Sequence, residues 1–241
     1  MISIISPVYN SEKCLKKLVE KISLYTKKIT NKFEIILVDD GSNDESWKMI
    51  NHLKKQNTFL KAIKLSKNYG QHYAIFQGIK SSKEELIIVM DCDLQDNPAY
   101  IVEMVRTYKK VKKPIIIEHS YKNFKFSERF ISNIFWYFLS AISLRKFSPN
   151  LGNYLLINKK IKKKYLSLEK VGYLYGDLIL QGNNFVHIKK TRSLGARDKS
   201  TYNLTKLISL GMKLILKYNF ISANFIFSRK KKIKILVEKN I

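Results

Sequence analysis

The sequence predicts an α/β protein with a mostly parallel sheet flanked by helices. Short apolar runs rich in β-branched residues recur in the first part of the chain, amphipathic stretches separate them, and acidic or polar residues follow several of the runs. The expected elements alternate, with strands at 2–6, 34–38, 61–65 and 86–90 and helices near 11–28, 44–56, 70–81 and 98–110. This alternation is typical of parallel sheets whose strands are joined by helical crossovers.

The rest of the chain continues the pattern more loosely. We expect a strand at 115–118, an aromatic-rich helix at 124–145, a loop at 149–153, a strand at 154–157, a Lys-rich helix, a helix from 173–180 and a strand at 185–191. Over 204–227 apolar residues and lysines fall on opposite sides of a helical pattern, as in helices that lie in a bilayer interface. We therefore expect one domain over 1–203 and a basic, amphipathic membrane-surface segment over 204–241.

The composition is strongly basic. The 241 residues include 45 Lys and Arg against 19 Asp and Glu, a formal net charge of +26. Such a charge attracts phosphates, nucleic acid or anionic lipid. The basic run 229–232 near the end of the chain favours a membrane surface. The basic residues are not interleaved with aromatic residues in a stacking platform, and we find no nucleic-acid motif, so nucleic acid is not an expected partner.

Two further features bear on location. Cys14 and Cys92 have neither metal-ligand spacing nor a disulfide framework, which fits a reducing compartment. The first residues read as a strand and not as a signal peptide, and lysines interrupt the best apolar window, so no spanning helix is expected. These patterns predict a cytoplasmic protein attached peripherally to the inner face of the plasma membrane.

The most informative motif is the acidic end of the run at 87–96. Asp91, Asp93 and Asp96 follow an apolar strand and should emerge together at its carboxyl end. Open α/β sheets bind their ligands at that edge. Two hard oxygen donors suit Mg²⁺ or Mn²⁺ together with a substrate diphosphate, because such ions usually keep only one or two protein carboxylates.

Polar turns also follow the first two expected strands. The first turn, 6–12, can place backbone donors and the Tyr9 ring around a base or ribose. In the second, 38–42, Asp39 and Asp40 stand side by side before a glycine. Helix capping does not explain this pair, since two adjacent carboxylates repel each other unless a donor-rich ligand or partner faces them. A carboxylate here can accept hydrogen bonds from ribose hydroxyls or a base N–H.

Together, the segments 3–12, 38–42 and 89–98 resemble glycosyltransferase family 2, whose inverting enzymes have a single GT-A type, Rossmann-like nucleotide-sugar domain. The resemblance is closest to the branch of dolichyl-phosphate mannose synthase and bacterial polyprenyl-phosphate glycosyltransferases, where an Asp-x-Asp-Leu-Gln-x-x-Pro segment stands at the position of Asp91 to Pro98. Segments 66–71 and 199–204 also resemble that branch.

The resemblance implies roles for particular residues. Those at the nucleotide sugar would be Pro7, Tyr9, Asn10, Asp39, Asp40, Asp91 and Cys92. The divalent cation, Mg²⁺ or Mn²⁺, would be held by Asp91, Asp93 and Gln95, with Asp93 counted as catalytic. Candidates to grip phosphate from the other side are Arg192, Arg197 and Lys199, for which a solvated basic surface is the alternative.

The chain departs from the family pattern on the acceptor side. Where relatives have a Gly-Asp-Phe-Arg segment, it has Gly152-Asn153-Tyr154-Leu155, and Asn153 can position a hydroxyl but cannot remove its proton. Asp177 is the remaining candidate for a general base, although it could instead be an acid favoured by a helix N-terminus. A phosphate acceptor would need no base. The paired C-terminal membrane spans of many relatives are also missing, so attachment by an amphipathic helix is expected.

We therefore expect a metal-dependent inverting enzyme that transfers a sugar from a nucleoside diphosphate sugar to an acceptor hydroxyl in cell-envelope glycan synthesis. Its other partners would be a glycan or lipid-linked acceptor and an anionic membrane surface. Three alternatives stay open: transfer to polyprenyl phosphate, a non-enzymatic basic protein that binds nucleic acid, and a degenerate family member that serves as a membrane scaffold.

Overall fold

The computed structural model describes residues 1–120, 137, 151–168 and 172–191. By its internal contacts the chain divides into two units, residues 1–123 with 150–199 and residues 124–149 with 200–241, and all the elements below belong to the first. The amphipathic stretch at 204–227, the expected boundary after residue 203 and, apart from residue 137, the expected helix at 124–145 lie outside the described residues.

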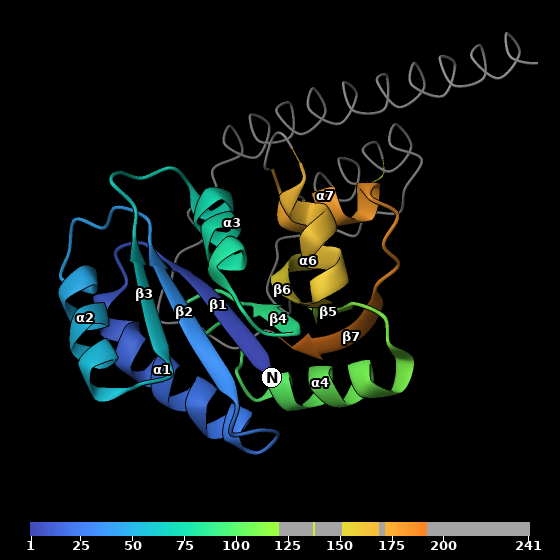
Figure 1. Cartoon of the computed structure of the whole chain (residues 1–241), viewed down its shortest axis with the longest axis horizontal. Coiled ribbons are helices and arrows are strands. Elements are labelled where there is room, and N and C mark those ends of the chain that lie inside the picture. The colour runs from blue at the N-terminus through green and yellow to red at the C-terminus, as the bar shows by residue number, and fades with distance from the viewer. Residues whose placement is uncertain (121–136, 138–150, 169–171, 192–241) are drawn as a thin grey trace, which may run out of the picture. The chain divides into compact units, whose positions relative to one another are not determined.

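The described strands form a seven-stranded sheet in the order β3-β2-β1-β4-β6-β5-β7 (Figure 1). The strands are β1 (Ile2–Val8), β2 (Phe33–Asp39), β3 (Leu60–Lys64), β4 (Leu86–Val89), β5 (Ile115–Ser120), β6 (Leu151–Asn158) and β7 (Val186–Thr191). Strands β1 to β4 are parallel, β5 and β7 are parallel to each other, and β6 runs antiparallel to both of its neighbours. The expected α/β class with a mostly parallel sheet is therefore confirmed.

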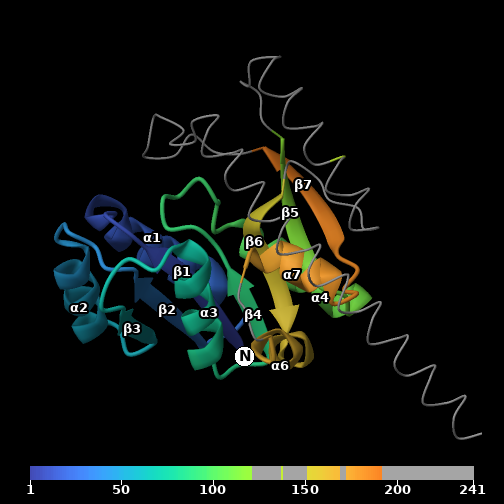
Figure 2. The ribbon, with the colours of Figure 1, turned by 90° about the horizontal axis from the view of Figure 1, so that it is seen from above.

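Helices cover both faces of this sheet. They are α1 (Glu12–Lys27), α2 (Ser46–Gln56), α3 (Gln71–Ser81), α4 (Tyr100–Val111), α6 (Lys159–Leu166) and α7 (Leu174–Leu180). Figures 1 and 2 show α1, α2 and α4 on one face and α3, α6 and α7 on the other. Among the helices of the described part, none combines the length and the apolar character that crossing a bilayer requires.

The centre of the sheet is buried on both faces, which explains its continuous apolar runs. Every residue of β1 is buried. Ile4 and Val8 belong to the large core cluster that includes Leu15 of α1 and Met104 of α4. On the other face α3 lies very close to the sheet, because a Cβ at Gly78 would overlap a methyl group of Ile5. Only glycine allows this approach without displacing the neighbouring side chains.

Strand β6 is longer than the sequence indicates. It begins at Leu151, so the expected loop at 149–153 is wrong for its last residues. The pairing of β6 with β5 shifts between Ile116 and Glu118, which marks a β-bulge or irregularity. Such an irregularity lets Gly152 and Asn153, which are typical of loops, lie within a strand.

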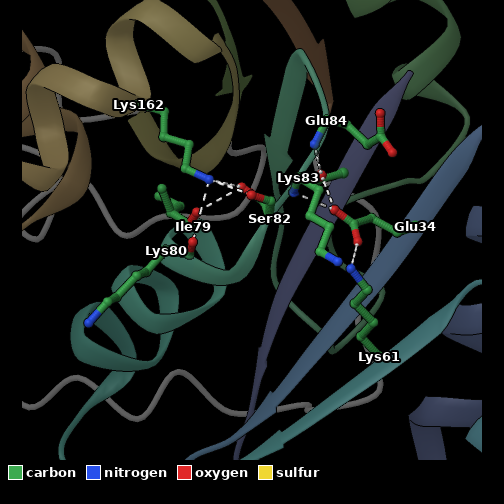
Figure 3. Close-up of polar contacts among 9 residues, drawn as sticks. Glu34, Lys61, Ile79, Lys80, Ser82, Lys83, Glu84 and Lys162 are labelled. Carbon is green, nitrogen blue, oxygen red and sulfur yellow. Dashed lines mark hydrogen bonds and ion pairs between the residues drawn. The ribbon is translucent and has the colours of Figure 1, made fainter.

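At the amino ends of the strands, Glu34 of β2 is buried but fully engaged (Figure 3). Its carboxylate accepts hydrogen bonds from Ser3 Oγ at 2.6 Å and from the backbone N of Lys83 at 2.7 Å, and it forms an ion pair with Lys61. Burial alone raises the pKa of this carboxyl group, but these donors outweigh it and the pKa is lowered. The contact ties β1, β2, β3 and the segment after α3 together.

Lys162 of α6 completes the same edge (Figure 3). Its ammonium group donates to the backbone oxygens of Ser82 and Lys80 and to Ser82 Oγ at 3.0 Å. The last carbonyls of a helix have no donor within the helix, so this side chain supplies one for α3. Burial lowers the pKa of Lys162, and the negative charge of Glu34 opposes that shift. The amino-end edge of the sheet is thus closed by polar contacts within the protein.

Candidate functional site

The three polar turns identified in the sequence meet at the carboxyl-end edge of the sheet. Strand β1 lies between β2 and β4, with Val8 opposite Asp39 and Ile5 opposite Val89. The turns after these strands are therefore neighbours, as expected from parallel strands. The edge gathers backbone turns and carboxylates from three segments that are distant in sequence.

The turns after β1 and β2 are fastened to each other. The backbone N of Asn10 donates to Ser42 Oγ at 3.0 Å, and Asn10 Oδ1 accepts from the backbone N of Asn43 at 2.9 Å. Ser11 N donates to Ser46 Oγ at 2.9 Å. Asn10 has a φ of 47°, a left-handed conformation that asparagine adopts more readily than most residues. Asn10, which we expected at the nucleotide sugar, thus joins the two turns.

Asp39, the last residue of β2, is 0% exposed, and neither of its carboxylate oxygens has a hydrogen-bond partner among the described residues. Burying an unpaired carboxylate is unfavourable, and such groups in native proteins are normally satisfied. Tyr9 stands at the end of the neighbouring strand with 38% of its surface exposed, whereas Pro7 is buried in β1. Both oxygens of Asp39 therefore lack a donor among the described residues, and a ligand that reached them could supply N–H or O–H groups.

Asp40 is buried beside it but is satisfied. Its Oδ1 accepts from the backbone N of Tyr69 at 2.8 Å and its Oδ2 accepts from the backbone N of Gly70 at 2.9 Å. Burial raises the pKa of the Asp40 carboxyl, the charge of Asp39 raises it further, and the two amides oppose the shift. The adjacent carboxylates therefore differ in what they face, although the sequence suggested a shared ligand.

Residues 66–70, the segment whose amides Asp40 binds, also pack against Gly41, the residue after Asp40. Gly41 has a φ of 68°, and a Cβ there would lie 2.5 Å from the carbonyl carbon of Lys67 and 2.6 Å from the nitrogen of Asn68. No other residue fits this approach without displacing the backbone. The turn after β2 and the segment before α3 are thus held together by a carboxylate and by a close backbone contact.

The turn after β4 carries Asp91. Gln71, the first residue of α3, donates from Nε2 to Asp91 Oδ1 at 2.5 Å. The backbone N of Asp91 donates to Asp96 Oδ2 at 2.9 Å, and Asp96 Oδ1 lies 3.0 Å from His119 Nε2. Asp96 is only 3% exposed. The expectation that three carboxylates emerge together is wrong for Asp96, because this side chain turns inward to hold the turn.

Within the same turn, Asp93 Oδ1 accepts from the backbone N of Gln95 at 3.0 Å. Leu94 between them has a φ of 63°, which is rare and unfavourable for a leucine. Strained backbone of this kind clusters at functional sites. Cys92, expected at the nucleotide sugar, is buried in the core cluster. In this turn Asp91 and Asp93 are half-buried, whereas Cys92 between them is buried.

The donor set fits a divalent cation that arrives with a substrate. Among the described residues, no cluster of three or more His, Cys, Asp or Glu side chains is arranged to hold a metal ion by itself. Asp91, Asp93 and Gln95 offer hard oxygen atoms on one short turn. Mg²⁺ and Mn²⁺ sites with one or two carboxylates usually take their remaining ligands from water and substrate phosphates.

On the expected acceptor side, Asn153 of β6 is 7% exposed, and its Oδ1 has no partner in the described part of the chain. The next residue, Tyr154, donates from its hydroxyl to the backbone oxygen of Asn97 at 3.0 Å, which ties β6 to the turn after β4. Burial, followed by the charge of Asp96, raises the pKa of Tyr154 well above its usual value. Asn153 therefore stands beside a segment fixed to the carboxylate turn.

Asp177, the candidate base, is buried in α7 and its Oδ2 accepts from the backbone N of Gly172 at 2.7 Å. Its charge contributes, after burial, to the raised pKa of Tyr165. Tyr173, just before α7, packs edge-on against His72 of α3 with ring centroids 5.5 Å apart. The starts of α3 and α7 are therefore neighbours. The expected phosphate-gripping residues Arg192, Arg197 and Lys199 lie outside the described residues.

Two residues that fix this edge were not singled out for a role in the sequence. In the sequence Gln71 is only the last residue of the 66–71 segment, and Asp96 is grouped with the other two carboxylates of its turn. Gln71 contacts Asp91, 20 residues away, and Asp96 contacts both Asp91, five residues away, and His119, 23 residues away. The only local signal is a polar residue directly after the Gly70 turn at the start of α3.

Comparison with known proteins agrees with this geometry. The sequence profile described as Glycosyl transferase family 2 matches residues 3–166, so the chain belongs to glycosyltransferase family 2. It is 40% identical over 107 residues to the undecaprenyl-phosphate 4-deoxy-4-formamido-L-arabinose transferases of Photorhabdus laumondii and Proteus mirabilis. These alignments cover 44% of this chain and 33% of each relative, about a third of their length.

Solved structures share the fold. The glucosyl-3-phosphoglycerate synthase of Mycobacterium tuberculosis, in complex with Mn²⁺, uridine diphosphate and glucosyl-3-phosphoglycerate, has a TM-score of 0.65 at 14% identity over 89% of this chain and 77% of its own. The mannosyltransferase PcManGT from Pyrobaculum calidifontis, in complex with GDP-Man and Mn²⁺, has a TM-score of 0.58 at 14% identity over 82% and 57%. At such identities the likeness establishes a GT-A-like α/β fold.

Proposed function

We propose that this protein transfers a sugar from a nucleoside diphosphate sugar to a polyprenyl phosphate, with Mg²⁺ or Mn²⁺ at the diphosphate. The observation that carries the proposal is the carboxyl-end edge of the sheet, where Asp39 is buried without a partner in the described part of the chain and lies on the same edge as Asp91 and Asp93. The family and the Mn²⁺ complexes of the structural neighbours support it.

The turns after β1 and β2 would bind the nucleoside. The two oxygens of Asp39 can accept hydrogen bonds from a base N–H and a ribose hydroxyl. The exposed Tyr9 ring offers a flat surface beside them, and Pro7 stiffens the end of β1. A buried carboxylate distinguishes strongly between ligands that supply donors and ligands that do not, because a missing donor leaves the charge unpaired.

The turn after β4 would bind the diphosphate. Asp91, Asp93 and Gln95 would hold the divalent cation, which when bound neutralises the charge that develops on the leaving diphosphate. The protein's own contribution is to hold these oxygens in one short turn, with Asp91 oriented by Gln71 and the turn anchored inward by Asp96. The positions of Arg192, Arg197 and Lys199 in the sequence make them candidates for a second contact to the phosphates.

A phosphate acceptor fits the acceptor side better than a hydroxyl does. A hydroxyl needs a general base, but an amide, Asn153, stands where relatives have a carboxylate, and Asp177 is buried with an oxygen bonded to Gly172 N. A phosphate monoester is ionised at neutral pH and needs no base. The names of the relatives include undecaprenyl phosphate. We therefore prefer polyprenyl phosphate to the hydroxyl acceptor that the sequence led us to expect.

In the proposed reaction a phosphate oxygen of the acceptor attacks the anomeric carbon of the sugar. The bond between that carbon and the diphosphate oxygen breaks, and the nucleoside diphosphate leaves with the electron pair. One displacement inverts the anomeric configuration, and no proton has to be removed.

The proposed setting is cell-envelope glycan assembly at the inner face of the plasma membrane. The formal net charge of +26 supports attraction to anionic lipid, and the 204–227 segment, with its amphipathic pattern, is the proposed contact. Such attachment would keep the enzyme close to a lipid-linked acceptor.

The test uses the full chain in detergent with Mn²⁺, undecaprenyl phosphate and a panel of radiolabelled nucleotide sugars. We expect label to appear in a lipid-extractable product that mild acid releases, and the Asp177→Asn variant to retain most of the rate. A rate loss of about 100-fold or more in Asp177→Asn, with transfer to a hydroxyl acceptor, would favour the general-base mechanism instead. Glu20→Gln, an exposed substitution on α1, serves as the control.

A further inference from the structure

We propose that Gln71 and Asp40 are positioning residues for the cation site, with Gln71 orienting Asp91 and Asp40 fixing the backbone from which Gln71 reaches it. The inference rests on the proposed function, since it concerns the same diphosphate site. It assigns Asp40 a different role from the nucleoside contact that the family resemblance implies.

The first step is the direct contact. Gln71 Nε2 lies 2.5 Å from Asp91 Oδ1. Gln71 itself is an exposed residue. A carboxylate on a strand-end turn can rotate about its side-chain bonds, and a single strong hydrogen bond restricts that rotation. Groups that hydrogen-bond a metal-binding carboxylate set its orientation and commonly matter to affinity. Gln71 is uncharged, so it orients Asp91 without neutralising the negative charge that attracts a cation.

The second step is the anchor of Gln71. The two residues before it, Tyr69 and Gly70, donate their backbone N–H groups to the two oxygens of Asp40 at 2.8 and 2.9 Å. Asn68 Oδ1 also accepts from Gly70 N at 3.1 Å, and Gly70 adopts a φ of 95° that favours glycine. The start of α3 is therefore fixed by a buried carboxylate at the end of β2.

The third step is the opposite side of Asp91. Its backbone N donates to Asp96, which in turn contacts His119 of β5. The backbone of Asp91 is thus linked to β5 through Asp96, and its side chain is hydrogen-bonded to Gln71 of α3. Because each oxygen of Asp40 accepts from a backbone amide of the loop, Asp40 holds the loop in place. Its neighbour Asp39, with neither oxygen engaged among the described residues, is the one suited to a nucleoside.

The decisive experiment is Mn²⁺ binding to the Gln71→Leu variant. Electron paramagnetic resonance would measure free Mn²⁺ in the presence of UDP or GDP, whichever stabilises the wild-type protein more. Leucine has a similar size and lacks the amide, and residue 71 is exposed, so we expect an unchanged melting temperature. Mn²⁺ affinity should fall about 10- to 100-fold, and turnover lost at low Mn²⁺ should return as Mn²⁺ is raised.

Gln77→Leu, in the same helix, is the matched control and should bind Mn²⁺ as the wild type does. Asp40→Asn should lower Mn²⁺ affinity in the same direction as Gln71→Leu, because its amide can accept from one loop N–H but presents a donor to the other. Neither Gln71→Leu nor Asp40→Asn should change binding of the mononucleotide, UMP or GMP, measured without metal. A direct nucleoside role for Asp40 predicts loss of that binding in Asp40→Asn.

The possible outcomes separate the two proposals. Wild-type Mn²⁺ affinity in Gln71→Leu would overturn the positioning role and leave the proposed function standing. The absence of Mn²⁺ and nucleoside diphosphate binding in the wild-type protein would overturn both. A Gln71→Leu defect that no Mn²⁺ concentration reverses, with unchanged Mn²⁺ affinity, would assign Gln71 to catalysis or to folding and would also overturn the inference.

Discussion

Strand β2 carries one buried acid near each end, and the two have opposite surroundings. Glu34, near the amino end, receives hydrogen bonds from Ser3 Oγ and Lys83 N and an ion pair from Lys61 (Figure 3). Asp39, at the carboxyl end, receives none from the described residues. Both are almost inaccessible to solvent. The same chemical group is thus satisfied by the protein at one edge of the sheet and left without donors at the other.

The difference separates structural acids from acids available to a ligand. Leaving a buried polar group unpaired costs about 1–3 kcal/mol, and more for a charge. An unpaired buried polar group in a native protein has a reason, such as an ordered water, a bound ion or a functional role. The amino-end edge, closed by Glu34 and Lys162, stabilises the fold, and the carboxyl-end edge, with Asp39, Asp91 and Asp93, is where we place the ligand.

The largest expected effect is at the carboxyl end. Asp93→Ala should lower turnover about 1,000-fold or more, equivalent to ~4 kcal/mol of transition-state stabilisation, because the cation loses a ligand. The free energy of unfolding should stay near the wild-type value, since Asp93 contacts only the backbone of its own turn among the hydrogen bonds described here. Sugar-transfer assays and urea denaturation measure the two quantities. Wild-type turnover in this variant would refute the metal assignment.

The second effect is at the amino end of β2, where we expect a loss of stability and no loss of ligand binding. Glu34→Leu should lower the free energy of unfolding by about 3 kcal/mol, because Ser3 and Lys83 N lose their acceptor and Lys61 loses its partner. Nucleotide affinity of the folded protein should be unchanged. Urea denaturation gives the stability, and the exposed variant Glu20→Gln controls for the loss of one negative charge. A stable Glu34→Leu protein would remove the contrast between the two ends.

The third effect sharpens the contrast at Asp39. Asp39→Asn should weaken nucleoside diphosphate binding about 10-fold or more, because one oxygen acceptor is replaced by a donor. Stability without ligand should stay equal or rise, since an unpaired buried charge has been removed. Isothermal titration and urea denaturation report the two changes. A large loss of stability would mean that Asp39 is structural after all.

The smallest effect is a pH dependence of stability. The pKa of Glu34 is lowered in the folded state, so its carboxylate contributes stability that is complete above its usual pKa of 4.5 and is lost as pH falls through the folded value. Asp44, whose pKa is also lowered on balance, contributes a similar loss in any variant. Glu34→Gln should therefore show a smaller decline in unfolding free energy below about pH 4.5 than the wild type. Parallel curves for the two proteins would contradict the role of Glu34.

Much of the fold could be predicted because local sequence decides it. The β-branched runs that became β1, β2 and β4 end in polar turns, and the parallel arrangement brings those turns together. The family resemblance, read from the same turns, is confirmed. The start of β6 was misjudged, because an irregularity in its pairing with β5 places Gly152 and Asn153 in a strand, and pairing depends on the partner strand.

The site was predicted as a set of acids but not as an arrangement. Asp39, Asp40 and Asp96 look alike in the sequence, but their surroundings differ in the structure. Asp39 has no hydrogen-bond partner among the described residues, and Asp40 accepts from two loop amides. Asp96 contacts His119 and the backbone N of Asp91. Which way a carboxylate turns depends on the donors that distant segments bring. For the same reason the polar residue after the Gly70 turn does not by itself indicate that Gln71 reaches Asp91.

The central claim is that the carboxyl-end edge binds a nucleoside diphosphate through Asp39 and, with a cation, through Asp91 and Asp93. A thermal-shift measurement of the wild-type protein with UDP or GDP, with and without Mn²⁺, tests it most directly, because a ligand that binds the folded state raises its apparent stability. We predict that one of the two raises the melting temperature, that Mn²⁺ enlarges the shift, and that Asp39→Asn reduces it. No shift with either nucleotide at millimolar concentration, in the presence of Mn²⁺, would contradict the account.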